Sequence, residues 1–186
     1  MTKNLTEFLP IDIRATQPGD APEINKLFID RALDSAPGYP EFSETRIAHY
    51  KKNGEPIFRN TIERIQGDPE HFFMQVALLQ DEIAGYAVAE AAPDDPFCWW
   101  HGLTVAREYE GLGIGQQLGG VTRNWALSHG RPVRVRIVPA NERSMDFFGR
   151  QGFSFHDFEE PNEKIPIRFN IMELGARALG TEVQGA

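Results

Sequence analysis

A glycine-rich segment between a strand pattern and a helix pattern constrains this chain more than any other feature. The segment is Tyr109-Glu110-Gly111-Leu112-Gly113-Ile114-Gly115-Gln116, and it separates an alternating stretch over 97–105 from a helical stretch over 114–129. Glycines at alternate positions let a backbone approach an anion without side chains in the way. The helix that follows points free N–H groups and its positive dipole end at that anion. The segment therefore predicts a phosphate-binding turn in a sheet-and-helix fold.

The rest of the chain alternates between strand and helix patterns and contains no internal repeat. Strands are expected over residues 11–15, 71–79, 83–89, 97–105, 133–137 and 165–171. Helices are expected over 22–33, 43–52, 57–66, 114–129 and 141–148, with an irregular loop over 34–42. The short polar connection at 80–82 predicts an antiparallel hairpin, and the helical crossover at 114–129 makes its flanking strands parallel. A mixed sheet is implied.

Length and composition fit one globular domain. The chain has 186 residues, of which 41% are apolar and 25% charged, enough to bury a full core. We expect one domain over 11–174, a flexible N-terminus over 1–10 and a loose tail over 175–186. The net charge of -8 argues against a nucleic-acid partner and mildly favours cationic acceptors such as amines.

Cysteine, histidine and hydropathy patterns exclude several other classes. The single cysteine, Cys98, excludes an internal disulfide and is expected to be a buried, inert thiol. The five histidines show no paired metal spacing, so no metal is predicted. The N-terminal residues lack the apolar core of a signal peptide, and no run is long enough to span a bilayer. We therefore expect a cytoplasmic protein without a membrane partner.

Two common phosphate-binding motifs do not fit the glycine segment. A Walker loop needs Lys and then Ser or Thr after its last glycine, but Gln116 and Gln117 stand there. A dinucleotide fingerprint starting at Gly113 needs a third glycine where Leu118 stands. It also needs a carboxylate about 20 residues further on, where Val138 lies. A tight turn without any ligand remains the competing interpretation.

The remaining pattern is Gln/Arg-x-x-Gly-x-Gly/Ala, which residues 110–115 occupy, and here the chain resembles the GNAT superfamily of acyl-CoA-dependent N-acetyltransferases. Two further stretches agree. Leu103-Thr104-Val105 precedes the turn, and Asn141 is followed by Phe147-Phe148 and Gly152-Phe153. The resemblance covers about 11–174. It implies an α/β (α+β) fold with a mixed, mostly antiparallel sheet of about seven strands, helices on both faces and one parallel crossover around the glycine segment.

The resemblance also implies acetyl-CoA as co-substrate. Backbone N–H groups of the glycine segment would hold the pyrophosphate of coenzyme A, and residues 103–105 would pair with its pantetheine arm. The residues implied to bind this cofactor are Leu103, Thr104, Val105, Glu110, Gly111, Leu112, Gly113, Ile114, Gly115, Gln116, Asn141, Ser144 and Phe148. For Asn141, a helix cap is an equal alternative, and the two roles are compatible.

Two positions depart from the family pattern. Glu110 stands where Gln or Arg is usual, and we expect its repulsive charge to turn outward, with Arg107 or Arg143 compensating. Phe148 stands where many members have a Tyr that protonates the departing thiolate, and Phe cannot donate a proton. We expect it to pack beside the sulfur, with water as acid. The N–H near Val105 would polarise the thioester carbonyl.

A general base is also wanted, because an aliphatic ammonium with a pKa near about 10 must lose a proton before it attacks. Strand alternation predicts that Trp99, His101, Leu103 and Val105 share one face. His101 is the first candidate for the base, and Glu90, at the end of the neighbouring strand, is the second. The alternative for His101 is a hydrogen-bonded strand histidine without a catalytic role.

The acceptor side is implied by analogy only. The segment between the first helices would contribute Tyr39, Glu41, Phe42 and Tyr50, although surface packing is an equal interpretation for each. The resemblance implies N-acetylation of a small-molecule or peptide amine by direct attack, and a homodimer formed through the last strands. The alternative is a non-catalytic acyl-CoA-binding module, for which the absence of a Tyr at Phe148 is the best support.

Overall fold

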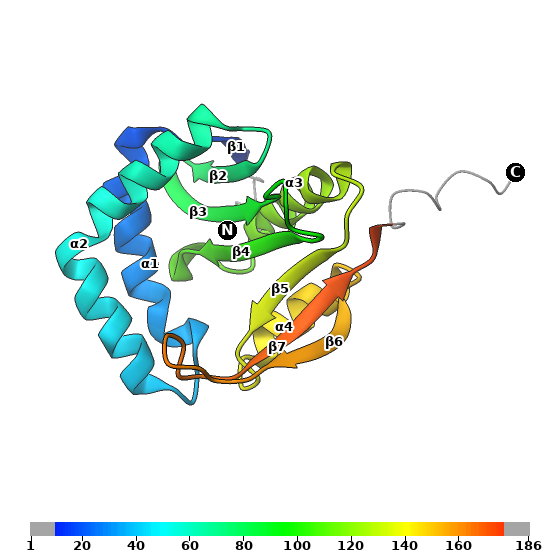
Figure 1. The fold of residues 1–186 in the computed structure, drawn as a ribbon. Helices are drawn as coiled ribbons and strands as arrows, with labels where there is room; N and C mark the ends of the chain where they lie inside the picture. Colours follow the sequence, from blue (N-terminus) through cyan, green and yellow to red (C-terminus); the bar gives the residue numbers. More distant parts are fainter. Residues whose placement is uncertain (1–9, 177–186) are drawn as a thin grey trace, which may run out of the picture.

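A seven-stranded sheet forms the centre of the computed structural model, which describes residues 10–176 (Figure 1). The strand order is β1-β2-β3-β4-β5-β7-β6, and β4 and β5 are its one parallel pair among the described residues. This confirms the predicted mixed, mostly antiparallel sheet with one parallel crossover. The strands are β1 (Asp12–Ala15), β2 (Phe72–Leu79), β3 (Glu82–Glu90), β4 (Cys98–Val105), β5 (Val133–Ile137), β6 (Ser154–Glu159) and β7 (Phe169–Leu174).

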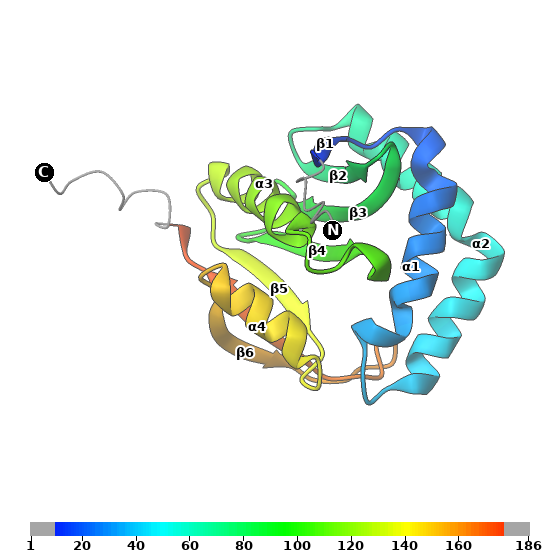
Figure 2. The same ribbon diagram turned by 180° about the vertical axis from the view of Figure 1, so that it is seen from behind.

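Helices cover both faces of the sheet, as predicted. Helices α3 (Ile114–Ser128) and α4 (Glu142–Arg150) lie behind it in Figure 1 and in front of it in Figure 2. Helices α1 (Ala21–Ser35) and α2 (Pro40–Gly67) pack against the other face of β2 and β3, where they bury Ile24, Ile62 and Tyr86 in one cluster. None of the helices described is both long and apolar enough to cross a membrane.

Helix α2 differs from the prediction of a loop over 34–42 and two separate helical stretches. It begins at Pro40, which suits the first helical position, and continues without a break to Gly67. Gly54 does not end the helix. A Cβ there would lie 1.9 Å from the Asn25 Oδ1 atom of α1, so this glycine permits close helix packing. Pro56 removes one backbone donor, and burial of neighbours such as Phe58 compensates for it.

The C-terminal strands also differ from the prediction. The last strand begins at Phe169 rather than 165, and Ile165 and Ile167 instead pack in a small cluster with Val138 outside the sheet. Strand β6 was not predicted, because its residues are almost all exposed and show no inward-facing alternation. The predicted flexible N-terminus and loose tail fall almost wholly on residues 1–9 and 177–186, which lie outside the described residues.

The predicted side-chain alternation along β4 was wrong because the strand contains a bulge. Trp100 and Gly102 face successive residues of β3, so His101 is the extra residue. The bulge reverses the faces that follow it. Leu103 and Val105 therefore point with Trp100 toward α3, whereas Trp99 and Thr104 point toward the side of α1 and α2. The two sides of β4 consequently serve different parts of the site.

Candidate active site

Strands β4 and β5 separate after a short parallel contact and leave backbone groups free. They pair only from Cys98 to Trp100, opposite Val133 to Val135. The Ala106 N–H donates to the Ala84 carbonyl of β3 at 2.8 Å. Because backbone direction alternates along a strand, the N–H and C=O of Val105 and Leu103 point away from β3, into the gap. The Val105 N–H, which was predicted to contact the thioester, therefore faces this gap.

The glycine segment forms a tight turn into α3. Gly111 and Gly113 have φ values of 80° and 83°, a region that disfavours other residues. Gly113 is the N-cap of α3, and the first helical bond recorded runs from the Gln117 N–H to its carbonyl. The N–H groups of residues 114–116 therefore lack helical partners and are available to an anion. Gly115 faces β4, and a Cβ there would lie 3.6 Å from Val105, an ordinary contact distance.

These elements open into one cleft of about 1280 Å³ between β4, β5, the N-terminus of α3 and the end of α1. The cleft is lined by all the residues predicted to bind the cofactor except Leu112, which is exposed. Asn141 caps α4 by accepting from the Ser144 N–H at 3.0 Å, and its Nδ2 donates to the Ser35 carbonyl. The cap is therefore confirmed, and it fixes α4 to the end of α1 beside the cleft.

The charge of the cleft is opposite to that of the whole chain. Six arginines and only three acidic residues line it, although the net charge of the protein is -8. The acidic Glu110 accepts from Arg143 at 2.8 Å and Arg31 at 2.6 Å, and Arg107 pairs instead with Asp34. Arg143 thus compensates the Glu110 charge as predicted, together with Arg31, which sequence reasoning missed. A cleft of this charge attracts anions.

Replacing Glu110 with Gln is expected to leave coenzyme A binding unchanged or to strengthen it several-fold in calorimetry. The change removes a carboxylate from the anion-binding turn and releases Arg143. The hydrogen bond from Arg143 lowers the pKa of Glu110. The Glu110 carboxylate therefore makes a small contribution to the free energy of unfolding at pH values above its pKa in the unfolded chain. This contribution is lost as the pH falls through the pKa of Glu110 in the folded protein. The Glu110→Gln variant should lack this pH dependence of stability. Glu55→Gln, in the pair with Arg59 outside the cleft, is the control. A large loss of affinity would show a specific role for the carboxylate.

The two candidate bases are hydrogen-bonded to each other. His101 Nε2 lies 3.0 Å from Glu90 Oε2, and both side chains are partly exposed. His101 lines the cleft, whereas Glu90 does not. If Nε2 carries the proton donated to Glu90, Nδ1 is left to accept one. No other hydrogen bond of His101 is recorded in residues 10–176. The bulge of β4 is what turns His101 outward, and no sequence signal marks it.

Phe148 forms part of the cleft wall while its ring is packed in the core. It is 6% exposed and lies edge-on to Trp100 at 5.0 Å and to Phe153 at 5.2 Å between ring centroids. Its position beside the gap between β4 and β5 agrees with a role in packing. Tyr86 of β3 lies opposite Thr104 and also lines the cleft, on the side of α1 and α2. Burial raises the pKa of Tyr86 to about 12, so it stays protonated at neutral pH.

Replacing Phe148 with Tyr is expected to maintain turnover or to raise it by up to about tenfold, because a hydroxyl at the cleft wall can protonate a thiolate. The measurement is kcat with acetyl-CoA, alongside the melting temperature. Phe153→Tyr is the matched control, since Phe153 packs on the same Trp100 ring but does not line the cleft. A sharply lower kcat at unchanged stability would show that the position is not simply a lost acid.

The predicted acceptor residues separate in the structure. Phe42 lines the cleft, whereas Tyr39 packs in the cluster around Val138 and Glu41 is exposed outside the cleft. Tyr50 packs against Phe28 at 4.2 Å between ring centroids. Sequence reasoning missed Arg46, one turn from both Phe42 and Tyr50, which lines the cleft. Its spacing of four from these two aromatic residues is a signal that could have found it.

A family model and several solved acetyltransferase structures are similar to this chain. The family model described as Acetyltransferase (GNAT) family matches residues 35–153. PaiA N-acetyltransferase from Thermoplasma acidophilum, solved with coenzyme A, is 18% identical with a TM-score of 0.71 over 89% of this chain and 99% of that chain. YncA from Salmonella typhimurium, solved with acetyl-CoA, is 16% identical with a TM-score of 0.62 over 90% and 94%. An N-acetyltransferase from Staphylococcus aureus is 17% identical with a TM-score of 0.63 over 90% and 99%. A search of curated proteins found no match.

Proposed function

Because the chain belongs to the GNAT family of acetyltransferases, we propose that it transfers an acetyl group from acetyl-CoA to a primary amine of a small molecule or peptide. The observation that carries this proposal is one cleft that joins three features. They are the anion-binding turn at the start of α3, the free edge of β4, and His101 backed by Glu90. Both substrates would meet in a ternary complex, where proximity supplies much of the rate.

The cofactor would lie across the gap between β4 and β5. The N–H groups of residues 114–116 would hold the pyrophosphate, with Arg143 beside it, and the free backbone groups of Leu103 and Val105 would pair with the amides of the pantetheine arm. This fits the open strand edge and the positive charge of the cleft. The related structures solved with coenzyme A or acetyl-CoA support the assignment through their shared fold.

His101 would remove the proton from the acceptor ammonium, directly or through water, while Glu90 holds its ring. The amine nitrogen then bonds to the acetyl carbon, the Val105 N–H stabilises the charge that develops on the acetyl oxygen, and the carbon–sulfur bond breaks. The attached nitrogen loses its excess proton as this bond breaks, and the departing thiolate takes up a proton through water. Phe148 would pack beside the sulfur.

Thiol release from acetyl-CoA in the presence of a panel of amines tests the proposal, after calorimetry has shown that coenzyme A binds. We expect amine-dependent thiol release and an acetylated product detected by mass spectrometry. A non-catalytic acyl-CoA-binding module is the second candidate, favoured by Phe148 at the usual position of the acid. Binding of coenzyme A without turnover on any amine would establish the module and contradict the enzyme.

We also propose that the protein forms a homodimer through β6, one of the two edge strands of the sheet. Its free edge can pair with a second copy, and Phe155 and Phe158 are half exposed beside each other at 4.7 Å. Sedimentation should show a dimer, and the double change Phe155→Ser with Phe158→Ser should yield monomers. A wild-type protein that stays monomeric as concentration rises would contradict this interface.

A further inference from the structure

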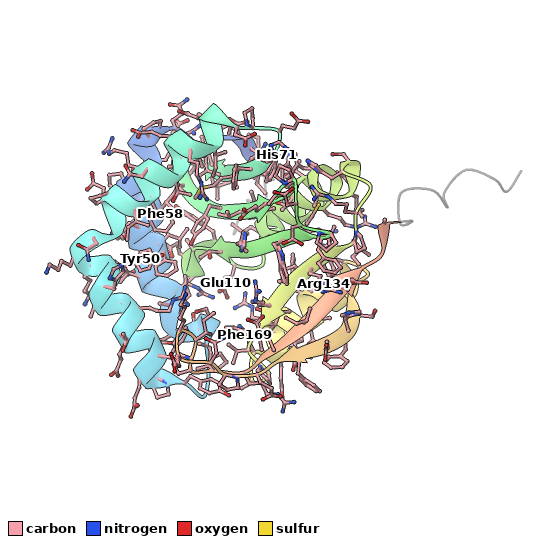
Figure 3. All side chains as sticks on the ribbon, viewed as in Figure 1. Tyr50, Phe58, His71, Glu110, Arg134 and Phe169 are labelled. Atoms are coloured by element: carbon pink, nitrogen blue, oxygen red, sulfur yellow. The ribbon has the colours of Figure 1, made fainter. Side chains whose placement is uncertain are left out.

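Arg46 of α2 reaches the cleft between two aromatic rings. Its guanidinium carbon lies 4.8 Å from the centroid of the Phe28 ring and 5.4 Å from that of Phe42, and all three residues line the cleft. The side chain is half-buried, and this burial lowers the pKa of Arg46, although an arginine stays charged at any physiological pH. Figure 3 labels Tyr50, the residue one turn further along α2.

The other arginines of the cleft differ from Arg46 in their surroundings. Arg31, Arg107, Arg136 and Arg143 each pair with a carboxylate, and Arg150 is exposed on α4. For Arg46, no ion pair or hydrogen bond is found within residues 10–176. A cation that is partly removed from water without a counter-ion is unfavourable, so the position favours an incoming anion.

The location of Arg46 assigns that anion to the acceptor rather than to the cofactor. Arg46 belongs to α2, which packs on the face of the sheet that carries Tyr86 and Thr104. Helix α3, which follows the anion-binding turn, packs on the opposite face. His101 lines the same cleft at the bulge of β4, between these two sides. An acceptor could therefore present its amine to His101 while another of its groups contacts Arg46.

We propose that Arg46 binds a carboxylate of the acceptor, so that the substrate class is a small amino acid carrying both an amine and a carboxylate. This inference rests on the proposed amine acetylation. A guanidinium presents two parallel N–H donors that match a carboxylate, and the flanking Phe28 and Phe42 rings hold it in place. Polyamines would be disfavoured, because they would bring a second positive charge next to Arg46.

The test compares acceptors that differ only in the carboxylate: L-phenylalanine with L-phenylalaninamide, and β-alanine with β-alaninamide. We expect kcat/KM for one of the acids to exceed that of its amide by about 10- to 100-fold, the range of one charge-assisted contact. The amide lowers the basicity of the neighbouring amine, so without carboxylate recognition the amide would react at least as well. Equal or faster acetylation of both amides would overturn the inference and leave the proposed acetylation standing.

Variants of Arg46 localise the effect. Arg46→Gln should raise KM for the acid by about 10- to 100-fold, change kcat little and leave coenzyme A affinity unchanged, whereas Arg46→Lys should retain part of the preference. A loss of coenzyme A affinity in Arg46→Gln would assign the residue to the cofactor and overturn the inference. If no amine of either kind is acetylated, the proposed function fails. Calorimetry of the two acids with the coenzyme A complex then tests the anion site separately. If the acids bind to the wild type and this binding is lost in Arg46→Gln, the anion site is supported. If the acids do not bind to the wild type, the inference is overturned.

Discussion

Replacing Gly85 with alanine is expected to lower the free energy of unfolding by about 1–3 kcal/mol and to weaken coenzyme A binding about tenfold. A Cβ at this position of β3 would lie 2.7 Å from the backbone carbonyl oxygen of Thr104 and 3.2 Å from Leu118. Because the closest atom belongs to the backbone, β3 and β4 must separate. Val105, which lies opposite Gly85, would move with β4. Denaturant unfolding and calorimetry measure the two effects.

Gly120→Ala is the matched control for this prediction. Gly120 lies in α3, and a Cβ there meets nothing within 4 Å. Alanine in a helix is more favourable than glycine by about 0.5–1 kcal/mol, so the control should be slightly stabilised and bind coenzyme A normally. If Gly85→Ala were as stable as the wild type and bound coenzyme A equally well, the close contact of the two strands would not position Val105.

Much of the fold was predictable from the sequence, because the strongest local signals agree with the global arrangement. The glycine segment lies between strand and helix as expected, and its two positive φ values explain why those residues are glycine. The predictions of secondary structure were wrong in segments where tertiary contacts override the local sequence signals. Gly54 is a helix breaker by propensity, but in the structure it is the place where Asn25 of α1 approaches α2.

The sequence indicated the parts of the cleft that are formed by backbone groups of short segments. It did not indicate the part where side chains from distant segments come together. The residues expected to hold the cofactor fall in two short stretches, 103–105 and 110–116, and at 141, 144 and 148, and apart from Leu112 they line the cleft. The proposed acceptor side is built from helix and strand residues far apart in the chain. Arg46 has the pattern of a solvent-facing helical residue, and Tyr86 that of a core strand residue. Only the packing of α2 against β3 brings the two beside one cleft.

The two faces of β4 line different parts of the site, because the bulge at His101 changes the face to which the following side chains point. Before the bulge, Trp100 anchors the core next to Phe148. After it, Leu103 and Val105 face α3 and offer their backbone edges to the gap, while Thr104 faces the acceptor side. His101, the extra residue, is therefore the one residue of β4 whose side chain does not follow the alternation of the strand, and it faces the cleft. The proposed base therefore lies at the cleft, on a residue whose position the bulge determines.

Replacing His101 with alanine is therefore expected to lower kcat by about 10²- to 10⁴-fold, the contribution of one positioned general base. The dependence of kcat on pH should also change, because the proposed general base is missing. Glu90→Gln should lower kcat by only about tenfold, since it removes the group that orients the ring but leaves the base. Steady-state kinetics over a pH series with saturating acetyl-CoA measures both effects.

A second histidine provides the control for this pair. His71 Nδ1 lies 2.8 Å from Asp68 Oδ1, a similar imidazole–carboxylate contact past the C-terminal end of α2, and His71 does not line the cleft (Figure 3). His71→Ala should retain the wild-type kcat and pH profile. If His101→Ala and Glu90→Gln behaved as this control does, with turnover and its pH dependence intact, neither group could be the base. The amine would then have to lose its proton to water before it binds.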